Sequence, residues 1–482
     1  MKNIFKALII LVSIFSITHF GICQINTKEE VSGVSGNAQT PSLKDKKDEV
    51  VPSVNFEKAL GTGSESRKPD YVLSLDDTIN LAFKNNKNIQ IQEKEVLVAK
   101  ASILDARSTF LPNVSARGSY NRNNKTPQPE NIFTGFKNDN KLALSLSQSL
   151  YNGENIASFK QAKLGLNVAE ETLRANKLDV EFEAKRLYFG LLLAYETERI
   201  AQDLLNQAQS HYDDVDKKFL EGTSSKFDLL QSKVQVSKVF PEVVKAKNSV
   251  DLISAELKKL LGLNINTAVS LNQKLEYLLM DIDEKEFLTE AYLNQPEMIL
   301  KSLGIDISKW EIEYAKSTNR PQVNLNGSYS YRSNKLNKII DSDNNNWNAG
   351  FVVSMPIFDG FSSKAKVDAA KAKYSEATLS KEDLSDQIAV DIRRACLDLI
   401  QAKAIIDATK DSIEEAKEAL RISQISYDNG EGTNLDILDA QVSLSQLEQN
   451  YSNSIYDYIM ARASLDKTMG RGLPEEKKNE NK

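Results

Sequence analysis

The most regular pattern along the chain is the alternation of apolar with small or polar residues in four short runs. The runs lie at 113–120, 142–150, 323–331 and 347–357. A period of two predicts strands with one apolar face, and the runs have about 8–11 residues, close to the length that a tilted strand needs to cross a bilayer. A half-buried strand of a soluble sandwich explains the alternation equally well. It does not explain why only four strands occur among so much helix.

The rest of the chain has helical periodicity with very few glycines or prolines. The predicted helices are 76–110, 154–219 and 226–261 in the first half, and 284–318, 361–428 and 434–469 in the second. The longest two have about 65 residues, which corresponds to roughly 100 Å at the usual rise per residue. The shorter helix after each of them is expected to fold back antiparallel. Apolar residues at heptad spacing indicate a coiled-coil-like seam, namely Phe159, Leu166, Leu173, Val180, Leu187 and Ala194.

Three landmarks recur in the same order in the two halves, which indicates an internal duplication. They are Pro112 and Pro321 before a strand, Gly153 and Gly360 after a strand pair, and the triplets Glu221-Gly222-Thr223 and Glu431-Gly432-Thr433. The members of each pair lie between 207 and 210 residues apart. We therefore predict a first repeat at 71–280 and a second at 281–472, each with the order helix, strand, strand, long helix, helix.

Composition narrows the function classes. The 482 residues include only 20 glycines and 11 prolines, which favours long helices and excludes collagen-like and turn-rich all-β chains. A mean hydropathy of −0.40 excludes a multispanning helical membrane protein. The net charge of −6 without a basic block argues against a nucleic-acid partner. Two cysteines and two histidines exclude a disulfide framework and a cysteine zinc site, so no cofactor or metal is expected, and Cys396 is expected to be a small core residue.

The N-terminus predicts export from the cytoplasm. Residues 1–23 have two lysines followed by an apolar run that is too short to span a bilayer, the pattern of a cleaved secretory signal peptide. Cys23 is alternatively a lipidation site, for which the bulky Ile22 is a poor neighbour. Residues 24–70 predict a disordered extension, and residues 473–482 predict a polar tail.

Together these features resemble the TolC-like outer-membrane factor family, the exit ducts of tripartite efflux pumps and type I secretion systems. The resemblance covers about 73–472. It rests on LSLDDTINLA from Leu73, GTNLDILDAQ from Gly432 and the strand openings after Pro112 and Pro321. It implies a mainly α protein with a small β part, which conducts passively from the periplasm or an inner-membrane pump to the exterior and is not an enzyme.

The resemblance also implies an assembly. Four strands cannot close a barrel, whereas a homotrimer supplies the twelve strands of a porin-like barrel in outer-membrane lipid. The long helices then continue as an α-barrel into the periplasm, and the loops 121–140 and 332–346 lie on the outer face. The implied partners are a periplasmic adaptor (membrane fusion) protein and an inner-membrane pump of the RND or ABC type.

The breaks at 221–225 and 431–434 are expected to form the hairpin tips at the periplasmic end. By resemblance, Gly222, Thr223, Gly432 and Thr433 with their flanks contact the adaptor. Turn chemistry alone also accounts for these glycines, and both roles are expected together because a tip must turn before it can dock. When the two triplets are aligned, the second break is predicted to be two residues shorter than the first.

Two carboxylates after the second break are candidates for the pore constriction. Asp436 and Asp439 are three residues apart and share a helix face, and the resemblance places this face at the closed entrance, where a trimer would form rings of like charge. Alternatively, Asp436 stabilises a helix N-terminus. Asp228 is the matching carboxylate of the first half, where Gln231 replaces the second one.

The sequence departs from the family pattern at Asn434, where some members carry an arginine that helps to lock the entrance, so a salt-bridge latch is not expected at this position. A hypothesis from another class is a periplasmic or surface coiled-coil scaffold or adhesin without a pore, which needs neither the strand pairs nor the duplication. An enzyme is the third hypothesis. His211 is its candidate, and we expect a solvated surface side chain there rather than a catalytic one.

Overall fold

The computed structural model describes residues 71–124, 129–132 and 134–472. The predicted signal peptide, Cys23, the predicted extension at 24–70 and the predicted tail at 473–482 lie outside the described residues. Along the chain the main elements are β1 (Tyr71–Leu73), α3 (Leu75–Asn85), α4 (Lys87–Ser108), β2 (Asn113–Arg122), β3 (Asn138–Tyr151), α5 (Gly153–Leu220), α6 (Lys226–Leu260), β4 (Val269–Leu271), α7 (Glu284–Asn294), α8 (Pro296–Ser317), β5 (Gln322–Ser333), β6 (Asn345–Ser354), α9 (Ser362–Asp428) and α10 (Asn434–Thr468).

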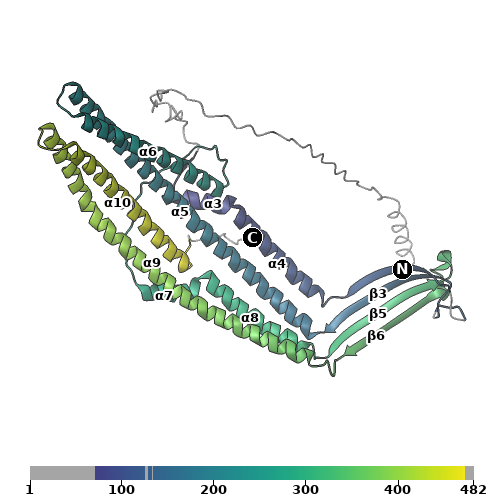
Figure 1. Cartoon of the computed structure of the whole chain (residues 1–482). Coiled ribbons are helices and arrows are strands. Elements are labelled where there is room, and N and C mark those ends of the chain that lie inside the picture. Colours follow the sequence, from purple (N-terminus) through teal and green to yellow (C-terminus); the bar gives the residue numbers. More distant parts are fainter. Residues whose placement is uncertain (1–70, 125–128, 133, 473–482) are drawn as a thin grey trace, which may run out of the picture. The chain divides into compact units, whose positions relative to one another are not determined.

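The four alternating runs form one antiparallel sheet in the order β2-β3-β5-β6 (Figure 1). Each strand is joined to a helix by a short connection at the same end of the sheet, and β1 pairs with β4 in parallel elsewhere. The central pair β3–β5 joins the first repeat to the second. The strands also extend into the expected outer loops, which reduces these to 123–137 and 334–344. The strands continue there because Asp139 and Asn140 still pair with the neighbouring strands.

The helices expected at 76–110 and 284–318 are each broken once, which corrects the sequence expectation. Asn86 separates α3 from α4, and its side-chain oxygen accepts hydrogen bonds from the amides of Asn88 and Ile89, so it caps a new helix. Gln295 separates α7 from α8 because the proline at position 296 disfavours helical backbone in the residue before it.

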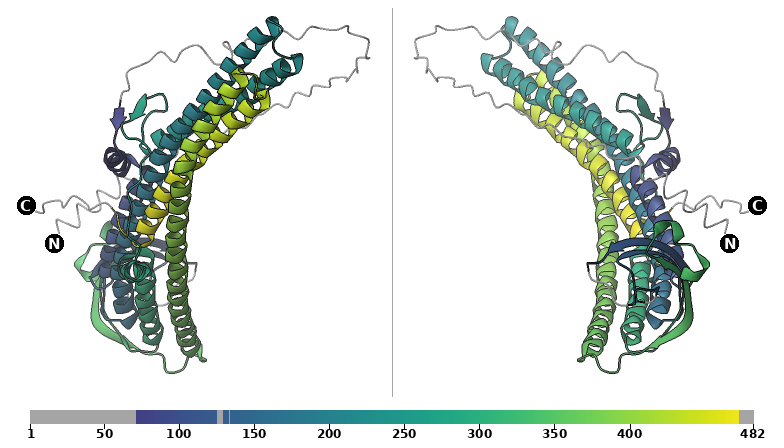
Figure 2. Two further views of the ribbon diagram at one scale, coloured as in Figure 1. Left: turned by 90° about the vertical axis from the view of Figure 1, so that its left-hand side faces the viewer. Right: turned by 90° about the vertical axis from the view of Figure 1, so that its right-hand side faces the viewer.

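The long helices pair with the shorter ones as predicted. α5 packs against α6 and α9 packs against α10, and α10 in turn packs along α5, so that the two hairpins lie side by side (Figure 2). On α5 the heptad residues Val180, Leu187 and Ala194 are buried, which confirms this part of the seam. Within the described residues, none of the helices combines the length and the apolar composition that crossing a membrane demands.

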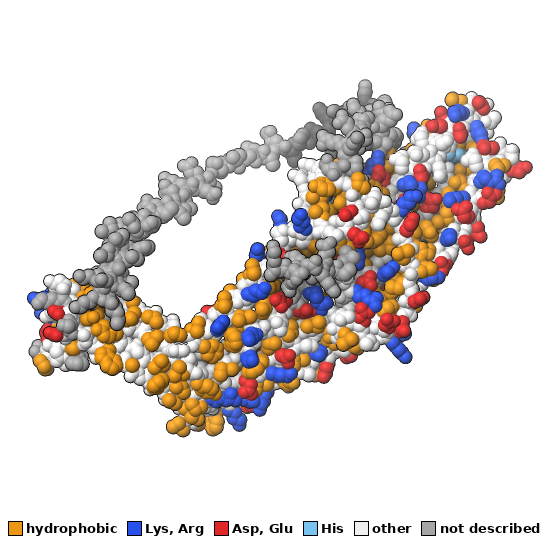
Figure 3. Space-filling model, turned by 180° about the vertical axis from the view of Figure 1, so that it is seen from behind, with side chains coloured by type: hydrophobic (Ala, Val, Ile, Leu, Met, Phe, Trp, Pro, Cys, Tyr) orange, Lys and Arg blue, Asp and Glu red, His pale blue; other side chains and the backbone are white. Residues whose placement is uncertain are grey.

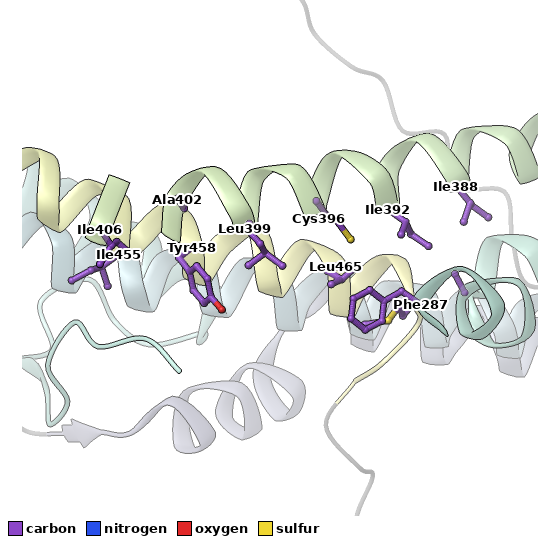
Figure 4. Close-up of a cluster of buried hydrophobic side chains, with 14 of the residues drawn as sticks. Phe287, Ile388, Ile392, Cys396, Leu399, Ala402, Ile406, Ile455, Tyr458 and Leu465 are labelled. Carbon is purple, nitrogen blue, oxygen red and sulfur yellow. The ribbon is translucent and has the colours of Figure 1, made fainter. Parts of the chain in front are cut away.

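Among the described residues there are two separate hydrophobic cores, one within the range predicted as the first repeat and one mainly within the range predicted as the second. In the second core, Cys396 lies between Ile392 and Leu399 on α9 and faces a layer that includes Leu465 of α10 and Phe287 of α7 (Figure 4). Cys396 is a buried, unpaired thiol, which confirms the expectation of a small core residue.

Candidate functional site

The register of the sheet gathers the apolar residues of all four strands on one face. Val114 lies opposite Leu146, and Leu144 and Trp347 lie on either side of Tyr329. The opposite face is built mainly from serine and asparagine residues. Figure 3 shows hydrophobic side chains over much of the sheet, whereas charged side chains gather over the helices. The apolar face carries Val114, Ala116, Tyr120, Leu142, Leu144, Leu146, Val323, Leu325, Tyr329, Trp347, Phe351 and Val353.

The first hairpin turn, between α5 and α6, has five residues. Gly222 adopts the left-handed conformation with φ of 79°, and the amides of Thr223 and Ser224 donate to the carbonyl oxygen of Lys218. Ser225 then caps α6, because its hydroxyl accepts from the amide of Asp228 at 3.1 Å while the Asp228 carboxylate accepts from the Ser225 hydroxyl at 2.6 Å.

The second hairpin turn, between α9 and α10, also has five residues, so the expectation of a shorter break is wrong. Here Gly430 is the left-handed residue, with φ of 76°, and the amides of Glu431 and Gly432 donate to Ser426. Thr433 is the helix cap and corresponds to Ser225, not to Thr223. The shared Glu-Gly-Thr triplets are therefore not equivalent in space.

Asp436 occupies the position that Asp228 has in the first hairpin. Its carboxylate accepts from the Thr433 hydroxyl at 2.7 Å and from the Thr433 amide at 2.8 Å. These two hydrogen bonds, the side-chain one first, hold the pKa of the Asp436 carboxyl below its usual value. The helix-stabilising role considered for Asp436 is therefore present. Asp436 and Asp439 both lie on an exposed stripe of α10 that also carries Leu435 and Val442.

A row of hydrogen-bonded polar side chains, called the polar chain below, joins the two hairpins close to their turns. Asn434 is only 3% exposed; its amide oxygen lies 2.5 Å from Nε2 of His211 on α5, and its amide nitrogen donates to Gln231 on α6 at 3.1 Å. His211 is 4% exposed, so the expectation of a solvated histidine is wrong. The reason is packing across the hairpins, because α10 covers this face of α5.

A second contact joins the hairpins nearer the turns. The Lys218 ammonium of α5 lies 3.0 Å from the Asp428 carboxylate at the end of α9 and 4.2 Å from the ring centroid of Tyr427. The Lys218 hydrogen bond is the main reason why the pKa of Asp428 lies below its usual value. Tyr427 also packs edge to face against His211, with 5.5 Å between ring centroids. The polar chain and this ion pair thus form one cluster.

Comparison with known proteins agrees with this architecture. The family model described as outer membrane efflux protein matches residues 78–263 and 288–471, most of each repeat. The chain belongs to this family. It is 22% identical over 418 residues to the outer membrane protein TolC of Vibrio cholerae serotype O1, an alignment that covers 86% of this chain and 93% of the relative.

Two further proteins are similar to this chain over most of their length. The alkaline protease secretion protein AprF of Pseudomonas aeruginosa is 22% identical, with 83% of this chain and 85% of the relative covered. The crystal structure of the Campylobacter jejuni CmeC outer membrane channel superposes with a TM-score of 0.73 at 21% identity, covering 89% of this chain and 94% of that chain.

Family membership confirms the predicted TolC-like fold, mainly α with a small β part, and the outer-membrane location with the helices in the periplasm. It also makes this chain a member of a transport family rather than an enzyme family, and favours the duct over the scaffold or adhesin. Sequence reasoning missed the burial of His211 and Gln231's contact with Asn434. No local pattern signals either, because the partners are more than 200 residues apart.

Proposed function

We propose that three copies of this chain form a continuous passive duct across the outer membrane and the periplasm. The observation that carries the proposal is the two-faced sheet with two open edges, β2 and β6. Backbone groups at an open edge have no hydrogen-bond partner in lipid, where each unpaired group costs several kcal/mol. Four strands cannot close on themselves. Pairing of β6 with β2 of a second copy removes both edges in a ring of twelve strands.

Exposed apolar side chains on the helices support the same assembly. α4 exposes Ile91 and Leu104, and α9 exposes Leu397 and Ile422. A soluble monomer seldom leaves such long apolar rows uncovered. Neighbouring protomers in an α-barrel would cover them.

The exposed stripe of α10 is the proposed entrance constriction. Asp436 and Asp439 point away from the packed interior of their own protomer, and the apolar Leu435 and Val442 flank them. In a trimer the stripe would face its two copies, giving rings of carboxylates that attract cations. Asp228 has the same capping role in the first hairpin. Because Gln231 beside it is already hydrogen-bonded to Asn434, we assign Asp228 a smaller contribution to the constriction.

The two turns are the proposed contact with a periplasmic adaptor, which links the duct to an inner-membrane pump of the RND or ABC type. Gly222, Thr223, Gly432 and Thr433 lie in these turns. Beside the first turn, Leu220 and Phe227 are 78% and 72% exposed. Large apolar side chains so exposed at a tip are typical of a docking surface.

The assembly is tested by the mass of the detergent-solubilised protein and by a pair of lysine variants. Phe351→Lys places a charge on the apolar face, which costs about 2–4 kcal/mol at mid-bilayer. Its control, Val352→Lys, places the same charge on the polar face of the same strand. We expect trimers for the wild type and the control, and loss of assembled protein for Phe351→Lys. A monomeric wild type, or equal tolerance of both lysines, would contradict the duct.

The entrance is tested in planar bilayers. The wild type should show small, cation-favouring conductance that divalent cations block, and Asp436→Asn with Asp439→Asn should lose the block and reduce the selectivity. Asp281→Asn is the control, since this exposed carboxylate lies in the segment between β4 and α7, away from the turns. Unchanged selectivity and block in the double variant would refute the entrance assignment while leaving the duct itself intact.

A further inference from the structure

The polar face of the sheet carries four ionisable side chains, three of them close to the loops and one, Arg117, at the middle of β2. They are Arg117 on β2, Asp139 and Lys141 on β3, and Arg332 on β5. The register places Lys141 directly between Ser119 and Arg332, and places Arg117 opposite Ala143, on the same face and two residues along. Three cations therefore share one side of the sheet with a single carboxylate.

That carboxylate is committed to Arg332. Asp139 is 6% exposed, and its two oxygens accept from Nε and Nη2 of Arg332 at 2.8 and 2.6 Å. The same guanidinium donates to the carbonyl oxygen of Ile132 at 3.4 Å, so it also contacts the backbone beyond the strands. Within the described residues, Arg117 and Lys141 are exposed and form no direct ion pair, although the charge of Lys141 also acts on the Asp139 carboxylate. The face thus retains a net charge of +2 in each protomer.

We infer that this basic patch, defined by Arg117 and Lys141, binds oxyanion groups of solutes as they pass through the outer half of the barrel. The inference rests on the proposed function, because the polar face lines a lumen only if the sheet closes into a trimer. Three copies place six unpaired cations around one water-filled passage. Rings of arginine and lysine select anions, and low-dielectric walls strengthen their field.

The position of the patch separates it from the acidic entrance. The carboxylates Asp436 and Asp439 lie beside the hairpin turns at the far end of α10 from the sheet. A solute with carboxylate, phosphate or sulfate groups would gain attraction inside the barrel after passing the entrance. The patch therefore determines a specificity of the duct that the entrance does not share.

The experiment uses the full-length protein in planar bilayers, with inorganic tripolyphosphate added on the outer side as the probe. Entrance selectivity is removed in all samples by Asp436→Asn with Asp439→Asn. We expect tripolyphosphate to block this channel. With Arg117→Gln and Lys141→Gln added, the same block should need about a tenfold higher tripolyphosphate concentration, because electrostatic focusing raises local ion concentrations by this order. Preference for chloride over potassium should fall in the same variant.

The matched control is Arg122→Gln, which removes one cation from the same strand but at the alternate side-chain position. Each single glutamine variant is also measured, and Arg117→Lys with Lys141→Arg preserves both charges and should preserve block. A trimeric, conducting channel whose block is unchanged by the glutamine variants, or changed equally by Arg122→Gln, would overturn the inference alone. Absence of trimers or of conductance would instead refute the proposed duct.

Discussion

The two hairpin turns have the same backbone and expose different side chains. Both contain five residues, a left-handed glycine and a reciprocal helix cap, Ser225 with Asp228 in the first and Thr433 with Asp436 in the second. Beside the first turn the exposed side chains include the apolar Leu220 and Phe227, whereas the second hairpin exposes the carboxylates Asp436 and Asp439 next to Leu435. The two tips share the hydrogen bonds that make the chain turn, and each tip has its own surface chemistry.

The clearest difference concerns one equivalent position. Asn434 is the first residue of α10 and is buried against His211 and Gln231, whereas Lys226, the first residue of α6, is exposed. The second hairpin is thus fastened onto the first through a buried hydrogen-bonded contact. Hydrogen bonds that exclude water depend little on salt, unlike surface ion pairs.

Removing that contact is expected to have the largest effect. His211→Phe keeps the ring packed against Tyr427 but leaves the buried amide oxygen of Asn434 without its donor, which costs about 1–3 kcal/mol. Hydrogen exchange of the α5 and α10 amides beside the turns should accelerate by about tenfold to a hundredfold. Gln209→Ala, an exposed site on the same helix, should leave exchange unchanged. Equal exchange in both variants would show that the polar chain does not hold the hairpins together.

Removal of the two caps tests whether the turns are equivalent. Thr433→Val and Ser225→Ala each delete the capping hydroxyl, and each should cost about 1 kcal/mol. Amide hydrogen exchange should therefore become faster by similar factors, near fivefold, in the first turn of α10 for Thr433→Val and in the first turn of α6 for Ser225→Ala. Channel conductance should change only with Thr433→Val if Asp436 lines the entrance. Clearly unequal exchange would contradict the structural equivalence of Ser225 and Thr433.

The pH dependence of the second cap has a defined sign. The folded-state pKa of Asp436 lies below its usual value, so its hydrogen bonds contribute stability above the pKa of the unfolded chain. This contribution is lost as the pH falls through the folded value. The advantage of wild type over Asp436→Asn in urea unfolding should therefore shrink below about pH 4. In a Thr433→Val background the stability advantage of Asp436 over asparagine at this position should be smaller at every pH. A pH-independent difference between wild type and Asp436→Asn would contradict this assignment.

Much of this comparison was accessible from the sequence. Period-two alternation predicted all four strands, and the heptads predicted the α5 seam, because both patterns are local consequences of burial on one side. The match of Asp228 with Asp436 was also correct. The Glu-Gly-Thr identity aligns the two turns with an offset of two residues, whereas the pattern Ser/Thr-x-x-Asp, which defines the cap, aligns them correctly.

The break before α8 is also a local feature, because Pro296 disfavours helical backbone in the residue before it. Other features depend on contacts that no local pattern encodes. The burial of His211 arises from α10, which is more than 200 residues away. The basic patch also needed the register of β3 against β5, since a shift by one residue would place Lys141 on the apolar face.

The smallest effect on stability is expected at the exposed apolar residues beside the two caps. Phe227 and Leu435 occupy equivalent positions after the two caps and are both exposed. Serine at either position should change the free energy of unfolding by no more than about 0.5 kcal/mol. A photo-crosslinking residue at 227 should give adducts with the periplasmic adaptor in growing cells, whereas one at 435 should give chain-to-chain adducts. Chain-to-chain adducts from 227 would place the first tip inside the trimer and leave the adaptor to the second.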